Sequence, residues 1–195
     1  MTRRALVPLA LLAAASLALS ACGGSSDSDK ITEVIEAEAT SSDPSNCTEL
    51  ETQRFDEQNS QEKGKAAVKS CEEEARKGES QAKSANVLNV SVNDERATAE
   101  VEFEGGSLNS QVLELALVEE EGDWKLDQIE GFAKYDGKAL GAAFLQEFEE
   151  HPEGITKSQG TCIAREIGEA SQAEAEALFF SGSPSAIIEL AEGCA

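Results

Sequence analysis

Basic residues and histidine are scarce in this chain of 195 residues. It has 16 Lys and Arg against 38 Asp and Glu, which gives a formal net charge of -22. Proteins that bind nucleic acid neutralise phosphates with clustered Lys and Arg, so this balance excludes a nucleic-acid partner. The one histidine, His151, leaves no His-based triad and no multi-His metal site. The 40% of hydrophobic residues nevertheless indicates a folded protein rather than a disordered polymer.

The sequence signatures of several kinds of chemistry are missing as well. The chain has no Walker loop, no G-x-S-x-G, no G-x-G-x-x-G and no C-x-x-C. Its acidic runs at residues 72–74, 119–121 and 147–150 lack the spacing of a twelve-residue calcium loop, and we interpret them as solvated faces. Asp127 is the nearest candidate for a catalytic acid, but its alternation with Trp124 and Leu126 predicts that it faces solvent. We therefore predict no catalytic residue, no metal, no cofactor and no enzymatic activity.

An apolar run occurs at the N-terminus. Arg3 and Arg4 precede apolar residues 5–19, and small residues follow. A basic start, a short apolar stretch and a small-residue exit are typical of a secretory signal peptide, which we place at residues 1–21. The run is too short to cross about 30 Å of hydrocarbon comfortably, and Pro8 interrupts it.

The sequence L-S-A-C at residues 19–22 resembles the lipobox of bacterial lipoproteins. The resemblance implies that the thiol of Cys22 is diacylglycerated, with palmitate as an acyl chain, and that Cys22 becomes the first mature residue. It also implies export, with the protein anchored by lipid to the outer face of the bacterial cytoplasmic membrane. Gly, Ser and Asp dominate the residues that follow, so we predict a flexible tether over residues 22–30.

The other four cysteines are even in number, which in an exported chain favours disulfides. They permit three pairings. We favour Cys47–Cys71 and Cys162–Cys194, because each pair falls within one compact helical segment. Closing loops of this size contributes roughly 3–4 kcal/mol for each bond in the chain-entropy model.

Hydrophobic periodicity predicts helices, then strands, then helices again. The expected helices are residues 30–40, 47–53, 60–77, 137–150, 161–180 and the segment from Pro184. The expected strands are residues 85–93, 96–104, 110–119 and 124–129, joined by short turns as an antiparallel meander. This order indicates an α+β fold.

The motif V-N-D-E-R-A-T-A-E-V-E-F at residues 92–103 and the phrase G-D-W-K-L-D-Q-I at residues 122–129 follow two predicted helices. This pattern resembles the nuclear transport factor 2-like superfamily over about residues 30–132. The resemblance implies N-terminal helices packed on a curved four-stranded antiparallel sheet, cone-like and with a possible pocket, in a domain over residues 31–135. It also implies that Trp124 is a packing residue. Residues 136–195 are expected to form a disulfide-clamped helical segment.

These observations predict a lipid-anchored extracytoplasmic protein that is a non-enzymatic binding or interaction module with an unknown ligand. Two alternatives stay open: an exported small-molecule enzyme with its pocket in the cone, and a subunit that docks a protein partner or a second copy of itself. Two or more convergent polar groups in a pocket would favour the enzyme. An exposed apolar sheet face would favour the partner subunit.

Overall fold

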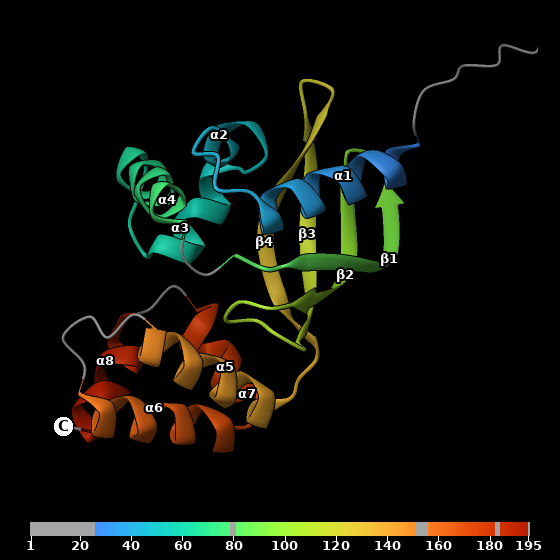
Figure 1. Cartoon of the computed structure of the whole chain (residues 1–195). Helices are drawn as coiled ribbons and strands as arrows, with labels where there is room; N and C mark the ends of the chain where they lie inside the picture. The colour runs from blue at the N-terminus through green and yellow to red at the C-terminus, as the bar shows by residue number, and fades with distance from the viewer. Residues whose placement is uncertain (1–25, 79–80, 151–155, 182–183, 195) are drawn as a thin grey trace, which may run out of the picture.

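The computed structural model describes residues 26–78, 81–150, 156–181 and 184–194 and shows the predicted α+β architecture (Figure 1). Helices precede and follow a four-stranded antiparallel sheet, which is not closed into a barrel. The predicted signal peptide, Cys22 and His151 lie outside the described residues. None of the helices within the described ranges combines the length and the apolar content that a membrane crossing requires.

The first helix, α1 (Asp27–Thr40), begins earlier than the sequence predicts. Ser26 caps it: the Ser26 hydroxyl accepts from the backbone N–H of Asp29, and the Asp29 carboxylate accepts from the N–H of Ser26. This capping box satisfies two backbone donors that the helix would otherwise leave free. The predicted tether over residues 22–30 is therefore wrong for residues 27–30, because Ser and Asp favour helix starts as well as flexible linkers.

Three further helices precede the sheet: α2 (Asn46–Glu49), α3 (Gln53–Ser60) and α4 (Lys65–Lys77). The prediction of one helix over residues 60–77 is wrong at its start. Gln61 and Gly64 both have positive φ, at 60° and 61°, so the chain turns between α3 and α4. Gly78 ends α4 in the left-handed conformation, which glycine adopts readily.

The sheet has the strand order β1 (Ser84–Asn93), β2 (Arg96–Glu104), β3 (Val112–Glu120) and β4 (Asp123–Lys134). All neighbours pair antiparallel, which confirms the meander, although β4 runs further than residues 124–129. The register shifts once between β1 and β2 and three times between β3 and β4. Such irregularities bend and twist strands, which lets a sheet curve around a helix.

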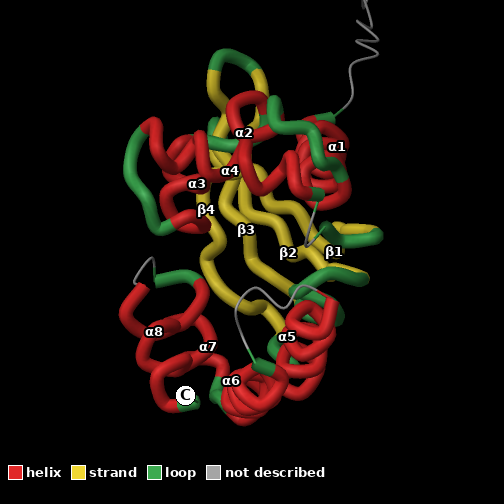
Figure 2. Tube along the Cα trace, turned by 60° about the vertical axis from the view of Figure 1, so that its left-hand side comes forward, coloured by secondary structure: helices red, strands yellow, loops and turns green. Residues whose placement is uncertain are grey.

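The N-terminal helices cover one face of the sheet, with α1 across it and α2–α4 toward β4 (Figures 1 and 2). Ile31 and Ile35 of α1 are buried there with the alternate residues of the strands, and Trp124 is 2% exposed. The opposite face carries mainly polar side chains, such as Glu100 and Glu114. One buried and one solvated face are typical of an antiparallel sheet.

The chain after the sheet forms α5 (Gly137–Glu150), α6 (Lys157–Glu169), α7 (Gln172–Phe179) and α8 (Pro184–Gly193) at one end of the molecule (Figure 1). The single helix predicted over residues 161–180 is wrong. Ser171 interrupts it and caps α7 through a capping box with Glu174. The Cys162–Cys194 disulfide joins α6 to the end of α8.

Aromatic rings connect this helical segment internally and to the sheet. The Phe179 ring stacks on Phe144 at 5.2 Å between centroids, and the Phe180 ring contacts Phe132 of β4 at 5.0 Å. The Gln58 amide of α3 donates to the carbonyls of Ile129 and Phe180. Phe179 and Phe180 thus pack within the molecule.

Candidate functional site

A cavity of about 340 Å³ lies between the N-terminal helices and the inner face of the sheet. Its apolar wall comes from strands, loops and helices: Ile35, Phe55, Phe103, Leu108, Leu113, Leu115, Leu126 and Ile129. Its opposite wall carries the Glu38, Glu51 and Asp56 carboxyl groups, with Glu74 exposed beside them. No Lys, Arg or His lines the cavity within the described parts of the chain.

Glu51 is directed inward by a backbone pairing at the edge of the sheet. The N–H of Leu126 donates to the carbonyl of Leu50, and the N–H of Thr52 donates to the carbonyl of Leu126, both at 2.8 Å. Glu51 thereby forms a one-residue parallel bridge with β4. Successive side chains of extended backbone point to opposite sides, so this pairing fixes the side on which Glu51 lies. Its side chain is buried, with 5% of the residue exposed.

Asp56 and Glu38 reach the same wall from two helices. Thr52 caps α3 by accepting from the N–H of Phe55, which places Asp56 in the first turn on the buried side. Asp56 is 1% exposed. Glu38 follows Ile31 and Ile35 on the inward face of α1, at the i+7 position of that stripe. Three separate elements therefore bring three acids together.

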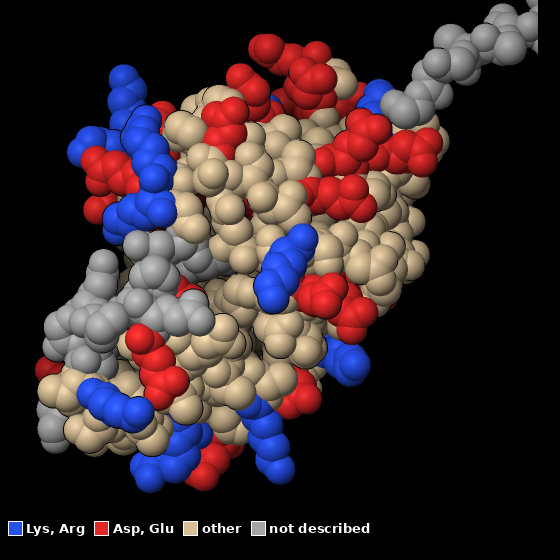
Figure 3. All heavy atoms as spheres, in the orientation of Figure 1, with Lys and Arg blue, Asp and Glu red and all other residues tan. Residues whose placement is uncertain are grey.

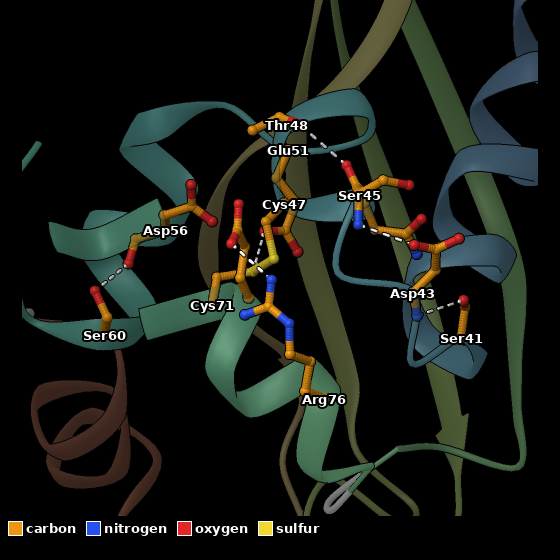
Figure 4. The surroundings of a disulfide bond; sticks show 12 residues. Ser41, Asp43, Ser45, Cys47, Thr48, Glu51, Asp56, Ser60, Cys71 and Arg76 are labelled. Atoms are coloured by element: carbon orange, nitrogen blue, oxygen red, sulfur yellow. Dashed lines mark hydrogen bonds and ion pairs between the residues drawn. A yellow bond between two sulfur atoms is a disulfide. The ribbon is translucent and has the colours of Figure 1, made fainter. Parts of the chain in front are cut away.

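The Cys47–Cys71 disulfide lies next to the carboxyl groups of Glu51 and Asp56 (Figure 4). The Glu51 and Asp56 oxygens and the two sulfurs all lie within 4.8 Å of one another. Oε2 of Glu51 is 3.2 Å from Sγ of Cys71. A disulfide sulfur carries no hydrogen, so it can only accept a hydrogen bond from Glu51 in its protonated form.

Burial and mutual repulsion keep protons on these carboxyl groups. Loss of hydration raises the pKa of Glu51 to about 11, assisted by hydrogen bonding to Asp56 and by the charges of Glu38 and Asp56. Burial is also the main cause that raises the pKa of Glu38 and that of Asp56. Burial disfavours the charged form of an acid, and like charges add to that effect. At neutral pH the cluster therefore holds at least one proton.

Asp56 has no hydrogen-bond donor among the described residues other than a proton on Glu51. Both of its carboxylate oxygens are buried and have no partner among the described residues when all three acids are ionised. A proton on Glu51 supplies one shared hydrogen bond, which Asp56 or Glu38 can accept. Buried polar atoms are nearly always satisfied, so a buried carboxylate whose oxygens are not all paired makes this cavity the candidate site.

The geometry does not suit the metal that its donor types suggest. Two sulfurs and two carboxylates at this spacing are a possible zinc set, but Cys47 and Cys71 are bonded to each other and offer no thiolate. The remaining carboxylates stand against a largely apolar wall, whereas calcium takes six to eight oxygen ligands.

Some of the residues that the sequence analysis singled out lie at this site, and others do not. Both predicted disulfides are confirmed, and Cys47–Cys71 borders the cavity. Asp127 lies outside it: its carboxylate accepts from the Thr52 hydroxyl at 3.0 Å and from Arg54 at 2.8 Å. This pairing ties β4 to the start of α3, which is a structural role. The short helix predicted over residues 47–53 is instead α2 followed by the extended segment around Glu51.

Sequence reasoning missed Glu38, Glu51 and Asp56. For Glu38 a signal was present, since it continues the inward stripe of α1. For Glu51 and Asp56 there was none, because their burial depends on the bridge to β4 and on the turn before α4.

Few apolar side chains are exposed. Leu88, 51% exposed, and Val92, 38% exposed, are the large exposed apolar residues of the described chain, and both belong to the edge strand β1. Single exposed apolar residues are normal on protein surfaces and do not form an interaction patch.

Comparison with known proteins identifies no relative, since the chain matches no protein family, no curated protein and no solved structure.

Proposed function

We propose that this protein is an extracytoplasmic binding protein, anchored by acylated Cys22, that holds a small ligand in the cavity between the N-terminal helices and the sheet. The observation that carries the proposal is Asp56, a buried carboxylate whose only donor among the described residues is a proton on Glu51, at a cavity of about 340 Å³. Cavities of this size, mostly apolar with a few convergent polar groups, are typical of small-molecule sites.

The same proposal includes membership of the nuclear transport factor 2-like superfamily and export to the outer face of the cytoplasmic membrane. The L-S-A-C motif at residues 19–22 supports export and anchoring. Helices packed against one face of a curved meander, with a cavity between them, support the superfamily. A tether leaves the acidic body free to stand away from an anionic membrane surface, which would repel it.

A cavity-filling variant tests the binding function. Leu108→Trp adds a large ring to the cavity wall, whereas Leu88→Trp makes the same change on an exposed strand edge. Binding of a library of small organic fragments is measured by ligand-observed NMR. We expect a subset of fragments to bind wild type and Leu88→Trp and to lose binding to Leu108→Trp. Fragments that bind all three chains equally, or none at all, would refute the proposal.

An exported enzyme is the second candidate, because the site has two features of general acid–base catalysis. Glu51 retains a proton at neutral pH, and Asp56 lies next to it as a potential proton acceptor. Two carboxyl groups whose environments separate their protonation are a common catalytic arrangement. The experiment above distinguishes the two functions: a bound fragment that is converted to a product, with conversion lost in Glu51→Gln, favours the enzyme.

A further inference from the structure

The charges around the cavity are unbalanced. Glu38 from α1, Glu51 before α3, Asp56 from α3 and Glu74 from α4 face it, and the sheet and the described loops contribute no charged side chain. None of the three inner acids forms an ion pair with a described basic residue. No basic side chain of the described residues therefore offsets this negative charge.

Among the acids that line the cavity, Asp56 is the one whose oxygens a ligand could supply with hydrogen-bond donors. Apart from a proton on Glu51, no described group donates to its two oxygens, and a buried carboxylate that is left partly unpaired destabilises the folded protein. A ligand that carries N–H donors and a positive charge would satisfy both oxygens and offset the repulsion from Glu51. Charge-assisted hydrogen bonds of this kind are about twice as strong as neutral ones.

The apolar wall of the cavity indicates which kind of group carries the positive charge of the ligand. Phe103, Leu108, Leu113 and Leu115 face the acids across the cavity, so a ligand that fills it must present apolar surface. A bare metal ion would leave this wall unfilled. An ammonium group on an apolar body matches both walls.

We infer that the cavity binds an organic ammonium ion, with its charged nitrogen among Glu38, Glu51 and Asp56 and its apolar body against the inner face of the sheet. This inference rests on the proposed binding function and names the chemical class of its ligand.

The surface charge of the protein suits such a ligand. Acidic side chains gather over α1 and the β3–β4 hairpin, and basic ones over the region of α3 and α4 (Figure 3). With a net charge of -22 the whole molecule attracts cations and raises their rate of encounter.

Binding is coupled to proton release. The free cluster holds protons because burial raises the pKa of all three inner carboxyl groups. An ammonium ion replaces such a proton as the source of positive charge, and the proton passes from the carboxyl group to the buffer. The affinity therefore rises with pH between about 6 and 8, where the amine itself stays protonated.

The test uses the purified full chain and three probes of similar shape: 2-phenylethylammonium, its neutral analogue 2-phenylethanol and the anion phenylacetate. Isothermal titration calorimetry in two buffers of different ionisation heat gives both the affinity and the number of protons released. We expect 2-phenylethylammonium to bind at least about tenfold more tightly than the alcohol at pH 8. We also expect it to release about one proton, and phenylacetate not to bind.

Asp56→Asn keeps the shape of the side chain and removes its charge. It should weaken 2-phenylethylammonium binding at least about tenfold and leave 2-phenylethanol binding unchanged. Glu114→Gln, on the solvated face of β3, is the matched control and should leave both affinities unchanged. The comparison of probes on wild type keeps the test valid if Asp56→Asn fails to fold.

The outcomes separate this inference from the proposed function. If the alcohol or phenylacetate binds as tightly as the ammonium ion, and Leu108→Trp abolishes that binding, the cavity is a ligand site but not for a cation. If calcium chloride alone saturates the site and prevents ammonium binding, the site belongs to a metal ion and the inference is wrong. If neither the probes nor the fragment library binds, both the inference and the proposed function fail.

Discussion

Glu51 and Cys71, which both line the cavity, are in contact: Oε2 of Glu51 lies 3.2 Å from Sγ of Cys71. The Cys47–Cys71 bond joins α2 to α4, and the segment from Leu50 to Thr52 pairs with β4. Cys47, Glu51 and Asp56 therefore lie within one short stretch of chain, which the disulfide ties to α4 and the backbone pairing ties to β4. Any change that loosens this stretch should alter both stability and binding.

The free energy of unfolding should depend on pH because the buried acids bind protons more tightly in the folded state. A carboxyl group whose pKa is higher in the folded state binds more protons there than in the unfolded chain, so its stabilising effect is complete below the unfolded pKa of about 4.3 and is lost as pH rises toward the folded value. For Glu51 the folded value is about 11. We therefore expect the free energy of unfolding of wild type, measured with urea, to fall between about pH 5 and pH 9.

Glu51→Gln removes one of these titrating groups. The variant should show a shallower slope and should be more stable than wild type at pH 8 by about 1–3 kcal/mol, because folding at that pH must add a proton to Glu51, whereas a neutral amide needs none. Exposed Glu114→Gln is the control and should keep the wild-type slope. Acids with lowered pKa values, such as Asp29 and Glu57, lose their stabilising effect only as pH falls below the unfolded value, outside this window. An unchanged slope in Glu51→Gln would count against the protonated cluster.

Trp124 should serve as a probe of the core, since it is the one tryptophan of the chain and is 2% exposed. We expect a blue-shifted emission that acrylamide quenches poorly. Trp124→Ala should destabilise the protein by about 3–5 kcal/mol, as for other large aromatic deletions, and Trp124→Phe by less. Emission like that of free tryptophan would show that the ring is not in the core.

Gly141 should be intolerant of any side chain. A Cβ there would lie 2.3 Å from the carbonyl oxygen of Ala164 and 2.9 Å from Cα of Gly168, both backbone atoms of α6. Gly141→Ala must therefore push α5 and α6 apart, and we expect a loss of about 1–3 kcal/mol. Gly193→Ala is the matched control, because a Cβ there meets nothing within 4 Å. Equal thermal stability of the two variants would contradict this close helix packing.

Cys22 should determine where the protein resides. Cys22→Ala should release it from membranes, because the L-S-A-C motif then lacks the thiol that carries the lipid. Intact-mass analysis of the membrane form should show a chain that begins at Cys22 with added acyl mass. A soluble mature form that starts at another residue would refute the lipid anchor.

The hydrophobic pattern predicted most of the secondary structure, and its errors have a local cause. The helix expected over residues 60–77 starts at Lys65, because Gln61 and Gly64 adopt positive φ that periodicity does not reveal. The helix expected over residues 161–180 divides at Ser171, whose side chain caps the next helix. In both cases backbone hydrogen bonding at a single turn outweighed a continuous apolar stripe.

The sequence by itself determined the α+β order of elements and the antiparallel meander, because both follow from spacing along the chain. It also favoured, among three possible pairings of four cysteines, the one that the structure has. The acidic cavity was decided by tertiary structure. In a chain with 38 acids the residue types of Glu38, Glu51 and Asp56 predict ordinary surface positions, and nothing local sets Glu51 and Asp56 apart. They become a site because the bridge to β4, the turn before α4 and the Cys47–Cys71 bond bring three elements together and exclude water from their carboxyl groups. Burial, which raises the pKa of an acid, is a property of that arrangement and not of the residue.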